Sequence, residues 1–173
     1  MTVAALAVAG CGSSKSAGVS PASYVKSVCT AASSWKNAIE TAGVKLQSEA
    51  SNKSLSTTKS AYVSFVDSLA SATGAAKNQL AAAGAPSVSN GKSISQTLVG
   101  AFGGAKTNLD AAAGDAAKIP TTSKSAFTAA ADKVQTDVRN SLAGMSRITP
   151  EKNPQLHAAA AKDPTCRSLA SGS

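Results

Sequence analysis

Three cysteines, Cys11, Cys29 and Cys166, are the residues of this chain with the most versatile chemistry. A thiolate can form a disulfide, bind a metal ion or act as a nucleophile. The single histidine, His157, is not part of an H-E-x-x-H motif and has no obvious nucleophile near it in the sequence. Because a catalytic triad or a metal site would have to use this histidine, we expect no metal ion, no cofactor and no enzymatic activity.

Cys11 comes directly after an apolar run and two small residues. Val3 to Val8 are mostly apolar, and Ala9 and Gly10 precede the cysteine. This order is typical of a signal-peptide cleavage site, where small side chains allow a protease to hold an extended backbone. We predict that residues 1–10 are a cleaved signal peptide and that Cys11 begins the mature protein.

Val8, Ala9, Gly10 and Cys11 resemble the lipobox of bacterial lipoproteins, which has an aliphatic residue, two small residues and a cysteine. With the Ala-rich and Ser-rich composition, the chain resembles the small lipoproteins of high-GC actinobacteria. The resemblance implies that diacylglycerol carrying acyl chains such as palmitate is attached to the Cys11 thiol. It also implies attachment to the extracytoplasmic face of the cell membrane. No Lys or Arg precedes Cys11, although signal peptides begin with positive charge, so we expect the coding sequence to start upstream of Met1.

Cys29 and Cys166 form a natural pair if Cys11 carries lipid. Disulfides persist in exported proteins, and a bridge between these residues would close a loop of 137 residues. The alternative is that they are two independent buried thiols.

The chain is basic, with 17 Lys and Arg against 9 Asp and Glu and a net charge of +8. The basic residues are scattered, and Lys26, Lys36 and Lys45 do not share one helix face at 100° per residue. Aromatic residues make up 3% of the chain and are not interleaved with the cations, so we expect no nucleic-acid binding. A solvated surface, with mild attraction to an anionic membrane or an anionic wall polymer, is the expected consequence.

Apolar residues recur at helical spacing, and no segment alternates with the period of a strand. Residues 11–20 are expected to hold the lipid-attachment cysteine and a flexible Gly/Ser-rich tether. A helix is expected from Pro21, with Ser20 as its cap, and others over 58–83, 90–118, 122–145 and 155–161. The apolar seam of the first helix consists of Val25, Val28, Ala32, Trp35, Ile39, Ala42 and Leu46.

Four amphipathic helices with short connections predict an all-α antiparallel four-helix bundle over residues 21–173. In this arrangement the first and fourth helices are neighbours, and the disulfide pins the C-terminal tail to the first helix. Gly100, Gly103 and Gly104 predict either a bend in the third helix or close helix approach. The stretch Asn90-Gly91-Lys92-Ser93 lacks the first glycine and the preceding strand of a P-loop, which favours a turn and helix start.

Two function classes fit these features. The first is a lipid-anchored, non-enzymatic module that interacts with an envelope protein or a wall polymer. The second is an extracytoplasmic carrier that binds an apolar or small ligand between helices. An apolar cavity near Trp35, Phe102 and Phe127 would favour the carrier, and a filled core would favour the interaction module.

Overall fold

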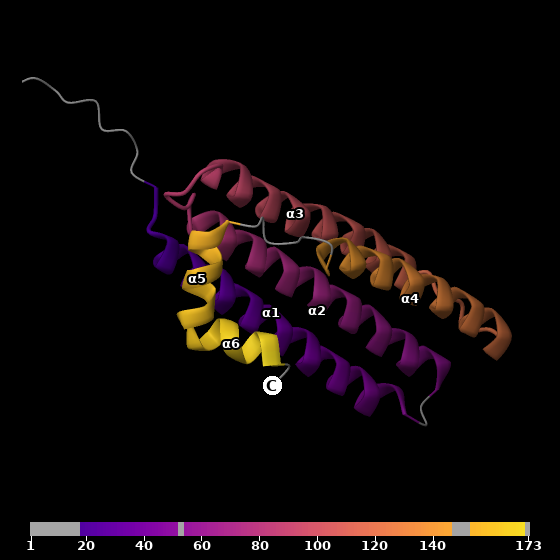
Figure 1. Ribbon diagram of the computed structural model, residues 1–173. Coiled ribbons are helices and arrows are strands. Elements are labelled where there is room, and N and C mark those ends of the chain that lie inside the picture. Colours follow the sequence, from indigo (N-terminus) through magenta and orange to yellow (C-terminus); the bar gives the residue numbers. More distant parts are fainter. Residues whose placement is uncertain (1–17, 52–53, 147–152, 172–173) are drawn as a thin grey trace, which may run out of the picture.

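The computed structural model describes residues 18–51, 54–146 and 153–171. These residues form six helices and no strand, which confirms the all-α prediction (Figure 1). The helices are α1 (Pro21–Ala50), α2 (Leu55–Ala82), α3 (Gly91–Ala116), α4 (Lys124–Ser146), α5 (Pro154–Lys162) and α6 (Pro164–Ser171). Val8, Ala9, Gly10 and Cys11 lie outside the described residues.

Side-chain caps and a glycine set the helix boundaries. Ser20 Oγ accepts a hydrogen bond of 3.2 Å from the Ser23 amide, ahead of the proline that opens α1. Ser54 Oγ likewise accepts from the Thr57 amide at 3.2 Å, so α2 begins three residues earlier than we predicted. The chain turns after α2 at Gly84, whose φ of 74° suits glycine.

The four long helices run back and forth along one another, with α2 between α1 and α3 (Figure 1). Helix α4 packs mainly against α3 and approaches α2. The predicted neighbour relationship of the first and fourth helices is wrong, because no Cα atoms of α1 and α4 lie within 8 Å of each other. Helices α5 and α6 cover α1 instead, so the described helices do not close into the bundle that we expected.

Two apolar clusters explain this arrangement. The larger one draws its buried side chains from α2, α3, the following connection and α4, and none from α1; they are Val66, Leu69, Ala70, Leu109, Ala112, Ala116, Ile119, Phe127, Ala131, Val134 and Val138. Most of the buried side chains of α4 therefore lie against α2 and α3 rather than against α1. The smaller cluster contains Ala31, Ala76, Leu80, Phe102, Ala105 and Met145.

The α1 seam is only partly buried as predicted. Tyr24, Val25, Ala31 and Ala42 are the buried residues of α1, and only Val25 and Ala42 belong to the predicted seam. Helix α1 is covered by α2 on one side and by α5 and α6 on another, so its buried surface is not a single stripe.

Helix α3 continues without interruption from Gly91 to Ala116 through its glycines. Lysine stems lie over two glycines where α2 meets α3. A Cβ placed on Gly74 would lie 3.0 Å from Lys106 Cε, and one on Gly103 would lie 3.8 Å from Lys77 Cε. The small residues therefore admit lysine stems from the facing helix.

None of the helices in the described ranges combines the length and apolar character required to cross a bilayer.

Candidate functional site

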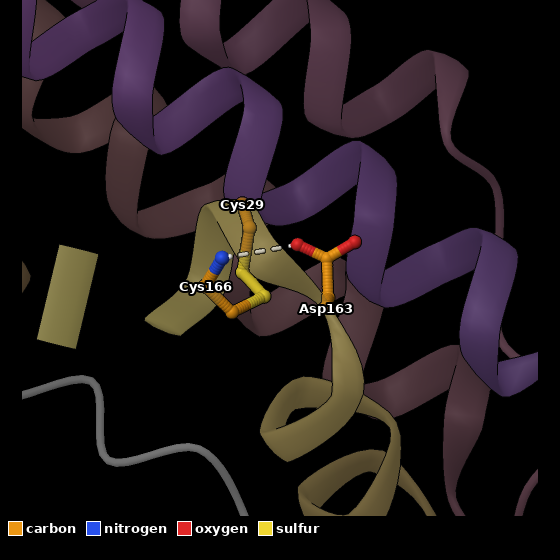
Figure 2. The surroundings of a disulfide bond; sticks show 3 residues. All are labelled: Cys29, Asp163 and Cys166. Atoms are coloured by element: carbon orange, nitrogen blue, oxygen red, sulfur yellow. Dashed lines mark hydrogen bonds between the residues drawn. A yellow bond between two sulfur atoms is a disulfide. The ribbon is translucent and has the colours of Figure 1, made fainter. Parts of the chain in front are cut away.

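A disulfide joins Cys29 on α1 to Cys166 on α6, which confirms the predicted pairing (Figure 2). The two Cα atoms are 5.2 Å apart, within the normal range for a disulfide. Asp163 Oδ1 accepts a hydrogen bond of 3.0 Å from the Cys166 amide and so caps the first turn of α6. We did not predict α6 from the sequence, although Asp163-Pro164 is a helix-start signal.

Apart from the disulfide, few interactions hold the C-terminal helices α5 and α6 against α1. None of the residues of α5 or α6 is buried. Leu156 and Leu169 are only half-buried, and His157 is exposed on α5. The covalent bond is therefore the main fastening between α5–α6 and α1.

The chain enters the body through backbone hydrogen bonds to the α2–α3 connection, an arrangement that we call the entry junction. The Val19 amide donates to the Ala85 carbonyl at 2.8 Å, and the Ser87 amide donates to the Val19 carbonyl at 2.8 Å. Residues 18–20, which we had expected in the tether, therefore belong to the folded body. The junction marks the entry end of the molecule, where α1 and α3 begin and α2 ends.

Glycines make the entry junction possible. A Cβ on Gly18 would lie 2.8 Å from the Ala85 carbonyl oxygen, and a Cβ on Gly91 would collide with the Pro86 carbonyl oxygen. Asn90 precedes Gly91 with φ at 60°, and α3 starts directly after it. The stretch that shares G-K-S with the P-loop is thus a turn and helix start, as we predicted.

Tyr24 and Ser95 connect the junction to the helices. Ser95 Oγ donates to the Gly84 carbonyl at 2.9 Å. Tyr24 is 3% exposed, and this burial raises the pKa of its phenol, although a hydrogen bond with Ser95 opposes the rise. The phenol therefore stays protonated and acts as a structural group rather than as a base.

The three aromatic residues proposed to line a ligand cavity do not meet. Trp35 and Phe102 pack edge to face, with ring centroids 5.6 Å apart, and both belong to the smaller cluster. Phe127 lies in the larger cluster. The rings of Trp35 and Phe102 therefore contact each other and do not line a cavity together.

A hollow of about 380 Å³ lies on α1, lined by Asn37, Glu40, Thr41 and Val44. It is open to solvent, and Val44 is 69% exposed. The Thr41 hydroxyl already donates to the Asn37 carbonyl at 2.8 Å. A solvent-open hollow of this kind does not offer the enclosed apolar walls that a carrier site needs.

Ionic contacts join α3 to α4 at the end opposite the entry junction, which we call the far end. Lys133 Nζ lies 2.8 Å from Asp115 Oδ2 on α3 and 2.8 Å from Asp137 Oδ2 on α4. Hydrogen bonding to Lys133, followed by its charge, lowers the pKa of Asp115, and hydrogen bonds to Asp115 and Asp137 raise the pKa of Lys133. We did not predict either contact. The i,i+4 spacing of Lys133 and Asp137 could have indicated their pair, but no local spacing indicates the contact of Lys133 with Asp115 across helices.

Within the ranges that the structure covers, no group of three His, Cys, Asp or Glu residues is arranged to hold a metal ion.

Comparisons with known proteins give no relative for this chain. No protein-family model matches it, and no curated protein or solved structure matches it.

Proposed function

We propose that this protein is a lipid-anchored, non-enzymatic accessory module of the cell envelope. Cys11 carries the acyl chains, and the helical body lies on the extracytoplasmic face of the cell membrane. Its partners in this role are an envelope protein or an anionic wall polymer.

The observation that carries the proposal is the Cys29–Cys166 disulfide. Disulfides of this kind form and persist in oxidising compartments outside the cytoplasm. Since the sequence contains three cysteines, the bridge leaves Cys11 as the odd one, and Cys11 stands at the end of the lipobox-like stretch. Two or more acyl chains, at about 0.8 kcal/mol per buried methylene, make a durable anchor.

The carrier remains the second candidate, and one observation weighs against it. Trp35 and Phe102 contact each other, and Phe127 belongs to another cluster, so the expected aromatic pocket is not assembled. Native mass spectrometry of the protein purified from membranes tests the carrier directly. A stoichiometric apolar ligand bound apart from the covalent lipid would favour the carrier over the accessory module.

Metabolic labelling tests the anchor. The protein is expressed from its own gene, with the codons upstream of Met1, in cells fed an alkyne fatty acid. We expect label in the membrane fraction and a mature N-terminus at Cys11 by mass spectrometry. Cys11→Ser removes the label, whereas the matched variant Cys29→Ser keeps it. Unlabelled wild-type protein in the cytosol with reduced thiols would disprove the proposal.

A further inference from the structure

The long helices have no carboxylate near the entry end. On α1 the first acidic residue is Glu40, about 28 Å from the helix start at about 1.5 Å per residue. On α2 the last is Asp67, about 22 Å before the helix end, and on α3 the first is Asp110, about 28 Å from the start. The acidic residues of α4 lie toward the far end, where Asp137 shares Lys133 with Asp115.

Cations are present where these carboxylates are absent. Lys92 lies in the first turn of α3, and Lys26 lies in the second turn of α1. Lys77 lies within two turns of the end of α2, but its stem runs along Gly103 of α3. Lys26 and Lys92 are exposed, and Lys77 is half-exposed. These three lysines form no ion pair with a carboxylate in the described ranges, whereas five lysines farther along the helices do.

Helix α6 adds to this positive end. Arg167 is exposed next to Cys166, and the disulfide holds it beside Cys29, about 12 Å from the start of α1. Lys162 is exposed close by, and the neighbouring Asp163 uses Oδ1 to cap α6. The balance of charge on the C-terminal helices is therefore also positive.

Local stability does not explain the position of Lys92. It lies in the first turn of α3, where the helix dipole repels a cation, and that turn contains no acidic residue. Lys124, the first residue of α4 at the far end, has the same unfavourable helix position, so what distinguishes Lys92 is its place at the end where the long helices have no carboxylate.

The chain path brings this end to the membrane if Cys11 is acylated. Gly18, at the junction, follows Cys11 by seven residues, which span at most about 25 Å when fully extended. An acylated Cys11 therefore keeps the entry end near the lipid headgroups.

We propose that the entry end is a docking surface for an anionic lipid bilayer, and that Lys26 on α1, Lys92 on α3 and Arg167 on α6 contact its phosphate headgroups. This inference rests on the proposed lipid anchor. The cations come from three helices and spread over an end of the molecule, which suits a fluid layer of headgroups that can adjust its spacing. The helices then stand on the membrane with the far end directed away from it.

Vesicle sedimentation of the full-length Cys11→Ser chain tests the surface without the acyl anchor. If this chain does not bind vesicles, the docking surface is disproved, but the result of labelling wild-type Cys11 is not affected. The docking surface and the lipid anchor are therefore tested separately. We expect binding to phosphatidylglycerol vesicles but not to phosphatidylcholine vesicles. Salt of about 1 M, which shortens the screening length to about 3 Å, should release the protein.

A pair of double variants locates the surface. Lys26→Gln with Lys92→Gln should lower the vesicle partition coefficient by about tenfold or more. The matched control, Lys45→Gln with Lys124→Gln, removes two exposed lysines from α1 and the first turn of α4 at the far end, and should leave partitioning within about twofold. Lys26→Arg with Lys92→Arg should retain binding, and circular dichroism verifies the folding of each variant.

Three outcomes would overturn the proposal. The first is absence of binding to anionic vesicles, and the second is an equal loss in both Gln doubles, which would indicate net charge alone. The third is binding to immobilised polyphosphate that depends on Lys26 and Lys92 while vesicle binding does not, which would assign the end to a soluble or wall polyanion.

Discussion

The indole Nε1–H of Trp35 on α1 donates a hydrogen bond of 3.0 Å to Thr73 Oγ1 on α2. Thr73 is fully buried and donates in turn to the Leu69 carbonyl at 2.8 Å. The Thr73 hydroxyl therefore donates one hydrogen bond to a carbonyl of its own helix and accepts another that orients the only tryptophan of the chain.

Thr73→Val should destabilise the protein by about 1–2 kcal/mol, because it keeps the shape but leaves the indole N–H without its acceptor. Urea unfolding followed by Trp35 fluorescence measures the change. Thr136→Val is the control, since the Thr136 hydroxyl donates to the Asp132 carbonyl in the same way but on an exposed surface. It should cost no more than about 0.5 kcal/mol. Equal effects of the two substitutions would contradict a role for the indole bond.

Reduction of Cys29–Cys166 should release α5 and α6 before the remaining helices unfold. The bridge closes a sequence separation of 137, for which the chain-entropy model gives an upper bound of about 5 kcal/mol. Both apolar clusters draw their buried members from α1 to α4 and the connection after α3, so this core should survive at room temperature with a lowered Tm.

Hydrogen exchange with and without a dithiol reductant measures this release by segment. Protection should be lost in α5 and α6 and retained in α2 and α3. The Cys29→Ser and Cys166→Ser double variant should behave as the reduced protein does. An unchanged melting curve in reductant would show that the disulfide does not contribute to the stability of this fold.

Two glycine substitutions should have opposite signs. Gly91→Ala places a Cβ against the Pro86 carbonyl oxygen, so the α2–α3 connection must shift at a cost of about 1–3 kcal/mol. Gly104→Ala meets nothing within 4 Å in the interior of α3 and should stabilise by about 0.5–1 kcal/mol. Chemical denaturation of both variants gives the comparison. A neutral Gly91→Ala would show that the entry junction is not closely packed.

The Asp115–Lys133 contact should make stability depend on pH in the acid range. Lys133 lowers the pKa of Asp115 from its ordinary value of 3.8, so the folded state favours the ionised carboxylate. The stabilisation is complete above the unfolded-state pKa and is lost as the pH falls through the lower folded-state pKa.

The check is the difference in unfolding free energy between wild type and Asp115→Asn along a pH series. We expect a small difference in unfolding free energy between the two proteins at neutral pH, and we expect it to disappear in strong acid. Asp67→Asn is the matched control, because Asp67 is an exposed carboxylate without a cationic partner among the described residues. A free-energy difference that persists unchanged below the folded-state and unfolded-state pKa values of Asp115 would rule out the ion pair as its source.

Local signals in the sequence were sufficient for the helices themselves. Ser20-Pro21 and Gly84 predicted where α1 begins and α2 ends, because capping and the left-handed turn depend on residues next to one another. Apolar residues at helical spacing predicted the helices that became α1 to α4. Cysteine counting predicted the disulfide, because few partners were possible.

Tertiary structure alone decided which helices meet. Periodicity states that a helix has an apolar face, but not which neighbour covers it, so α4 on the α2–α3 pair and α5–α6 on α1 could not be predicted. The entry junction and the Asp115–Lys133 contact also join segments distant in sequence. Lys26 and Lys92, far apart in the sequence, lie at one end of the molecule only because alternate helices reverse direction, so that α1 and α3 begin at the same end.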